Sequence, residues 1–177
     1  MRRRQYLKTV GSVAGAGALA GCSSGGSQDS GSNGEDGGGD PNTVDMVTDG
    51  ASYYFDPIGL FVEPGTTVTF RIESGSHTAT AYVDGLGGAA TTRIPDGGVE
   101  FDTGLLSQQG ATADVTFETE GTYDYFCIPH KTMGMVGRIV VGSPGGPAEG
   151  SMPPDGRVPE SAAIVDEGRI SFAEFSG

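Results

Sequence analysis

The segment Cys127-Ile128-Pro129-His130-Lys131-Thr132-Met133-Gly134-Met135 places a thiol, an imidazole and two thioethers within nine residues. The chain has only one other histidine, His77, which lies 50 residues before Cys127. On a flat extended strand Cys127 and His130 point to opposite faces, because side chains alternate. A strand that ends at Cys127 and continues into a tight loop lets both reach one ion. Pro129 stiffens such a loop, and Gly134 lets it bend back.

The residue types in this loop predict a particular metal. One cysteine, two histidines and a weak axial methionine form the ligand set of a blue-copper electron-transfer site. Thiolate and thioether favour Cu(I), whereas imidazole accepts either oxidation state. Taken singly, a cysteine or a methionine is often a buried apolar residue. Together, at this spacing and in a chain patterned for β-strands, the residues predict one bound copper ion.

This loop resembles that of the cupredoxins, the small blue copper proteins such as plastocyanin, pseudoazurin and, most closely, the halocyanins. Their ligand loop reads Cys-x2-His-x4-Met, which falls here on Cys127, His130 and Met135. Their first histidine follows an earlier strand, and His77 occupies that position. The resemblance implies a type 1 copper site with these four ligands, and it favours Met135 over Met133 as the axial one.

The resemblance also implies roles for neighbours of the ligands. In cupredoxins the loop histidine is the electron port, which falls here on His130, ringed by apolar residues. Candidates for this ring are Pro129, Met133 and the turn at 58–60. The family often has Asn after the first histidine; here it is Thr78, whose hydroxyl is expected to steady the cysteine loop. The residue before the cysteine is Phe126 rather than Tyr, so a second exit route for electrons is not expected.

The N-terminus reads as an export signal. Residues 1–21 hold a basic stretch with Arg2 and Arg3 and a short run of small and apolar residues, which resembles a Tat-type signal peptide. The end of this run, Leu19-Ala20-Gly21-Cys22, resembles a lipobox in which Cys22 becomes lipidated. The alternative is a secreted protein with an incidental cysteine. With Cys22 lipidated and Cys127 on copper, no disulfide forms in the mature chain.

Composition divides the rest of the chain into three parts. Residues 22–42 are rich in Gly, Ser and Asp and predict a flexible, disordered linker. Residues 43–142 form the predicted cupredoxin domain. Residues 143–177 begin as a Pro- and Gly-rich segment, and a short helix is expected between Pro159 and Gly168, docked against the domain.

The pattern of residues 43–142 predicts an all-β fold. Val68, Phe70 and Ile72 alternate with polar residues, as do Val115 and Phe117, which is the signature of half-buried strands. Further strands are expected around 44–46, 53–55, 60–62, 78–83, 123–127 and 139–141, separated by Gly, Pro and Asp turns. Many short strands of this kind predict a Greek-key β-sandwich or barrel. Residues 84–109 are expected to form loops.

The charge excludes some partners. The whole chain carries a net charge of −13, and from Cys22 onward 6 Lys and Arg stand against 23 Asp and Glu. Nucleic-acid binding and a polybasic membrane contact are therefore disfavoured. The acidic residues are spread along the chain, which favours solubility at high salt, as in a halophilic protein. Docking to a basic partner is the alternative.

These observations predict a monomeric, lipid-anchored carrier of single electrons on the outer face of the cell membrane. Its partners would be membrane or extracytoplasmic redox proteins. An enzyme is not expected, because further copper centres need further histidines and the chain has only His77 and His130. The alternative is extracytoplasmic copper delivery or storage, and redox cycling without metal loss separates the two. A bare interaction module leaves the Cys, His and Met pattern without explanation.

Overall fold

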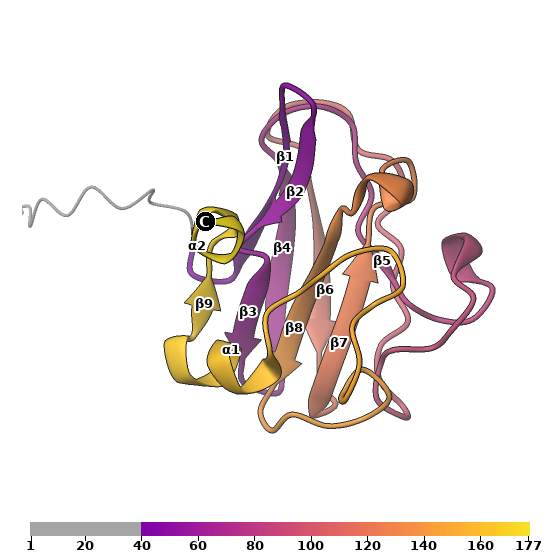
Figure 1. The fold of residues 1–177 in the computed structure, drawn as a ribbon, viewed down its shortest axis with the longest axis vertical. Helices are drawn as coiled ribbons and strands as arrows, with labels where there is room; N and C mark the ends of the chain where they lie inside the picture. Colours follow the sequence, from indigo (N-terminus) through magenta and orange to yellow (C-terminus); the bar gives the residue numbers. More distant parts are fainter. Residues whose placement is uncertain (1–39) are drawn as a thin grey trace, which may run out of the picture. The chain divides into compact units, whose positions relative to one another are not determined.

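The structure, a computed structural model, describes residues 40–177. The predicted signal peptide, Cys22 and most of the predicted linker lie outside the described residues. Within residues 40–177 two β-sheets pack face to face (Figure 1). No helix in this part of the chain is long and apolar enough to cross a membrane.

The first sheet has four strands in the order β2-β1-β4-β6. They are β1 (Thr43–Asp49), β2 (Ser52–Asp56), β4 (Thr66–Ile72) and β6 (Thr112–Phe117). β1 pairs antiparallel with β2 and parallel with β4, and β4 pairs antiparallel with β6. The parallel pairing of β1 with β4 arises because the chain leaves for the other sheet between β2 and β4.

The second sheet has five strands in the order β5-β7-β8-β3-β9. They are β3 (Gly59–Val62), β5 (Thr80–Ala81), β7 (Gly121–Phe126), β8 (Val136–Val141) and β9 (Arg169–Ile170). β7 and β8 are antiparallel, and the loop between them is the segment that contains the predicted ligands. The expected strand at 78–83 shortens to β5. Single bridges also join His77 to Leu106 and Thr80 to Asp102.

The core lies between the two sheets and confirms the predicted all-β sandwich. Alternate residues of each strand point inward, so that the two inner faces share one apolar cluster. This cluster also contains Cys127 and Met135 at one end. Its main members are Val44, Met46, Val68, Phe70, Ile72, Val115, Phe117, Tyr123, Tyr125, Ile139 and Val141.

The outer face of the second sheet is covered by residues 143–177. Every residue of β7 and β8 is buried, although one face of each strand points away from the core. The chain beyond Gly142 runs back across these strands, and α1 (Ser161–Glu167) and α2 (Phe172–Ser176) follow (Figure 1). Ile164 of α1 packs with Ile58, Val140 and Ile170.

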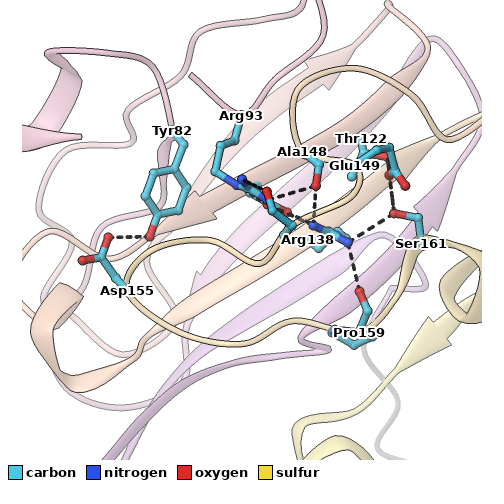
Figure 2. Close-up of polar contacts among 11 residues, drawn as sticks. Tyr82, Arg93, Thr122, Arg138, Ala148, Glu149, Asp155, Pro159 and Ser161 are labelled. Carbon is cyan, nitrogen blue, oxygen red and sulfur yellow. Dashed lines mark hydrogen bonds and ion pairs between the residues drawn. The ribbon is translucent and has the colours of Figure 1, made fainter. Parts of the chain in front are cut away.

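Buried charges lie beneath this C-terminal extension (Figure 2). Asp124 of β7 accepts a hydrogen bond from Arg138 Nε at 2.7 Å and from Arg93 Nε at 2.8 Å. Both arginines also donate to the carbonyl oxygen of Ala148, at 3.0 Å and 2.9 Å. Asp124 is 0% exposed and the two arginines are 5% and 2% exposed, so this ion triplet is almost completely removed from water. The triplet therefore ties the start of the extension to the sheet.

Candidate metal centre

His77 lies in the chain between β4 and β5 and is completely buried. Its backbone exchanges two hydrogen bonds with Leu106, both of 2.9 Å. The ring nitrogen Nε2 lies 2.9 Å from the carbonyl oxygen of Ser74 and 3.0 Å from the hydroxyl of Thr48. A carbonyl oxygen can only accept, so Nε2 carries the hydrogen. The lone pair of Nδ1 is therefore free to bind a metal.

The β7–β8 loop carries the other candidate ligands. β7 ends at Phe126, one residue before Cys127, where the sequence predicts the end of the strand. His130 precedes a single 3-10 turn, and Gly134 then adopts a left-handed conformation with φ +84°. The Cys127 amide donates to the Met135 carbonyl at 3.0 Å, and the Met135 amide donates to the His130 carbonyl at 3.3 Å. The loop thus folds back on itself and brings its two ends together.

Three ligand atoms converge at the end of the core. Cys127 Sγ lies 3.4 Å from His130 Nδ1 and 3.7 Å from His77 Nδ1, and the two Nδ1 atoms are 3.1 Å apart. Metal bonds of about 2.0 Å to nitrogen and about 2.3 Å to sulfur place such atoms roughly 3–4 Å from one another. The three atoms therefore have the spacing of ligands around one small ion.

The two methionines of the loop differ sharply in exposure. Met135 is 0% exposed and belongs to the same core cluster as Cys127, whereas Met133 is 54% exposed. Met135 thus packs in the core next to the ligand loop, whereas Met133 lies at the surface. Of the four predicted ligands, the structure brings together His77, Cys127 and His130 by distance and Met135 by packing.

Burial keeps the three converging groups uncharged when no ion is bound. Burial raises the pKa of the Cys127 thiol, and hydrogen bonds from Thr78 and His130 offset this only in part. Burial also lowers the pKa of both His77 and His130. Without an ion the group is therefore an uncharged thiol beside two neutral imidazoles. A metal ion would displace the thiol proton and bind neutral imidazoles directly, so these donors fit copper.

Thr78 holds the cysteine loop, as the sequence predicts. Its hydroxyl accepts a hydrogen bond from the Ile128 amide at 2.9 Å. Its own amide points at Cys127 Sγ at 3.4 Å. The short side chain suffices because His77 and Cys127 already bring the two segments into contact. Thr78 therefore contacts both the sulfur of Cys127 and the amide of the residue that follows it.

Tyr53 contacts His130, and the sequence did not predict this contact. Its ring stacks on the His130 ring with centroids 4.0 Å apart and planes 13° from parallel. Tyr53 comes from β2 of the first sheet, so nothing local in the sequence links it to the loop. In the sequence Tyr53 belongs only to the alternation at 53–55. That pattern predicts a strand but not a contact with the site.

The surroundings of His130 correct one expectation. The turn at 58–60 was a candidate for the apolar ring, but Ile58 and Leu60 are 3% and 2% exposed. They lie in and beside β3, between β8 and β9, under α1. The exposed apolar residues of the ligand loop are Ile128, Pro129 and Met133. Two of them, with Leu105, line a shallow apolar cavity of about 350 Å³.

Comparisons with known proteins show which proteins this chain resembles. Halocyanin of Natronomonas pharaonis is 31% identical over 91 residues, which cover 50% of this chain and 48% of halocyanin. The chain therefore spans about half the length of that relative. Plastocyanin of Scenedesmus fuscus is 30% identical over 100 residues, which cover 56% of this chain and 97% of plastocyanin. The crystal structure of pseudoazurin from Methylobacterium extorquens AM1 is 28% identical, with a TM-score of 0.49, over 63% of this chain and 85% of pseudoazurin.

The family profile described as copper binding proteins of the plastocyanin/azurin family matches residues 42–142, which is more than half of the 177 residues. This range contains His77, the β7–β8 loop and both sheets except β9. The chain belongs to the plastocyanin/azurin family of copper-binding proteins, and copper is its cofactor.

Proposed function

We propose that this protein carries single electrons between redox partners outside the cytoplasm, with one type 1 copper ion held by His77, Cys127, His130 and Met135. The observation that carries the proposal is the convergence of Cys127 Sγ and the two Nδ1 atoms within 3.1–3.7 Å. The copper ion supplies the one-electron chemistry by cycling between Cu(II) and Cu(I). The chain supplies a fixed set of donors for both states.

The residues around the donors keep them in place. His77 is held through Nε2 by Ser74 and Thr48, and Cys127 by the Thr78 amide and the loop backbone. A site fixed in this way needs little rearrangement when the charge of the ion changes. His130 is the one half-exposed member of the set, since His77 and Cys127 are fully buried. We therefore assign the exchange of electrons with a partner to the His130 edge.

The location is part of the proposal. A Tat-type signal and a lipid on Cys22 would place the domain on the outer face of the cell membrane, as a monomer beside membrane redox proteins. These features rest on the sequence of residues 1–22, which lie outside the described residues. An electron carrier is favoured over an oxidase or reductase because both histidines of the sequence are at this one site.

Copper delivery or storage is the alternative function. It calls for a site that releases its ion readily, whereas His77 and Cys127 are 0% exposed and braced by hydrogen bonds. Visible spectra of the mature chain with Cu(II), before and after ascorbate, test the proposal together with metal analysis. We expect an intense blue band that bleaches, returns on reoxidation and leaves one copper per chain after repeated cycles. A colourless protein, or copper lost at each reduction, would overturn the assignment.

A further inference from the structure

The C-terminal extension reaches the ligand loop as well as the sheet. Gly156 packs so closely on Val136 and the Gly134 carbonyl that a Cβ there would lie 2.7 Å and 3.0 Å from them. Val158 is fully buried in a small apolar cluster with Phe126 and Val136. Phe126 directly precedes Cys127, and Val136 directly follows Met135. The extension therefore packs against both ends of the loop that carries three of the proposed ligands.

The ammonium group of Lys131 also links the ligand loop to the C-terminal extension. Its Nζ donates to the Gly88 carbonyl at 2.7 Å and lies 4.8 Å from the centre of the Phe126 ring. It also lies 3.6 Å from Asp155 Oδ2, and each side chain of this pair is only 20% exposed. Lys131 directly follows His130 in the sequence, so its position limits where His130 can move.

Asp155 is in turn fixed on its other side. The Tyr82 hydroxyl donates to Asp155 Oδ2 at 2.8 Å (Figure 2). The pKa of Tyr82 is raised, mainly by burial and next by the neighbouring Asp155. The hydroxyl therefore keeps its proton and remains a donor. A hydrogen bond to a carboxylate is stronger than one between neutral groups. Asp155 therefore has one partner in the domain and one in the ligand loop.

We infer that Asp155 and Lys131 are positioning residues through which the C-terminal extension clamps the ligand loop and so sets the geometry of the copper site. Neither residue is a proposed ligand. The clamp itself is a property of the folded chain, and its effect on copper rests on the proposed function. An exposed ion pair contributes little to stability, but this pair is mostly buried and its role is to fix a loop rather than to stabilise the fold.

The first test uses the copper-free chain, so that it does not depend on the copper assignment. The amides of Met133, Gly134 and Met135 donate to loop carbonyls at 3.0, 3.1 and 3.3 Å, which makes their hydrogen exchange a direct report of loop opening. We expect Asp155→Ala to speed this exchange at least about threefold. Asp155→Asn, which still accepts from Tyr82, should speed it less.

The matched control is Ile164→Ala in the same extension. Ile164 is 0% exposed and packs on Ile58, Val140 and Ile170, none of which is in the ligand loop. It should lower the melting temperature and leave the exchange of the three loop amides unchanged under native conditions. Equal loop exchange in wild type and folded Asp155→Ala would overturn the clamp, as would equal acceleration by Ile164→Ala. If Asp155→Ala does not fold, Lys131→Gln removes the pair from its other side and is judged by the same measurement.

The second test uses the copper-loaded chain. We expect the reduction potential and the copper hyperfine splitting in the electron paramagnetic resonance spectrum to change in Asp155→Ala, partly recover in Asp155→Asn and stay constant in Ile164→Ala. Faster loop exchange with an unchanged copper signal would retain the clamp and overturn its effect on the site. A chain that binds no copper but shows the exchange pattern would contradict the proposed function alone.

Discussion

Two clusters of buried polar side chains differ in how their charges are balanced. Asp124 is matched within the chain by Arg93 and Arg138, and all three are 6% exposed or less. Among residues 40–177, Cys127 and the two histidines have no such partners, and burial shifts the pKa of each toward its uncharged form. The first cluster is complete as the chain folds, and the second is complete only with a cation. This difference separates a structural cluster from a functional one.

The largest expected effect comes from breaking the complete cluster. Asp124→Ala leaves two buried guanidinium groups without their carboxylate, and we expect it to cost about 3–5 kcal/mol of the free energy of unfolding. Urea denaturation with and without copper measures this. The loss should be present in both states, because no residue of the triplet is a proposed ligand and copper cannot replace the missing carboxylate.

The control for this change is a partly exposed ion pair of the first sheet. Arg71 Nε lies 2.7 Å from Asp45 Oδ1, but the two side chains are 35% and 27% exposed. Asp45→Ala should therefore cost about 1 kcal/mol or less. If Asp45→Ala and Asp124→Ala destabilise the chain equally, burial does not distinguish the two kinds of pair.

The second expected effect is the stabilisation of the fold by copper bound to Cys127, His77 and His130. Copper that binds only the folded chain should raise the free energy of unfolding by about 4 kcal/mol at a free concentration 1,000 times Kd. Cys127→Ser removes the thiolate, so this gain should shrink and the blue band should disappear. Thermal denaturation with and without Cu(II) gives the gain, and absorption gives the band. An intensely blue Cys127→Ser variant would refute the assignment of the sulfur ligand.

The third effect is the pH dependence of copper binding. Burial raises the pKa of Cys127, so below that pKa the free thiol must release one proton on binding. Burial lowers the pKa of His77 and His130, so near neutral pH both are already deprotonated and release none. The apparent affinity should therefore rise about tenfold for each pH unit in this window.

Proton release in weakly buffered solution provides a direct check of this count. About one proton should appear for each copper bound near neutral pH, and Cys127→Ser should release none. Below the lowered pKa values of His77 and His130, protons also compete with the metal for the two imidazoles, so the pH dependence should steepen in acid. A flat affinity across neutral pH would mean that the thiol is already ionised in the copper-free chain.

The copper loop was predictable from the sequence because its chemistry is local. Cys127, His130 and Met135 lie within nine residues, and the strand before them and the glycine between His130 and Met135 follow from ordinary strand and turn preferences. The alternation at 68–72 and 115–117 likewise fixed which side chains face the core. Thr78 was predictable because it neighbours His77 and carries a short hydroxyl.

The burial of the outer face of the second sheet was not predictable, because it depends on contacts between segments far apart in the sequence. In the sequence Asp124 alternates with buried residues as an outward polar residue would, just as Thr69 does in β4. It is buried only because residues 143–170 return across β7 and β8 and because Arg93 arrives from a loop. The turn at 58–60 was misplaced for the same reason: β3 became an inner strand once β9 paired with it. Tyr53 reaches His130 only after the two sheets pack.

The smallest expected effect tests whether Met135 or Met133 is the axial ligand of the copper site. Met135→Leu keeps an apolar side chain of similar size in the core, so the chain should fold and still bind copper. Loss of the weak axial donor leaves three ligands, a number that suits Cu(I) better than Cu(II), so the reduction potential measured by voltammetry should rise. Met133→Leu is the matched control, since Met133 is 54% exposed and should leave the potential unchanged. A rise in Met133→Leu and none in Met135→Leu would assign the axial position to Met133, and the burial of Met135 would then be a matter of packing alone.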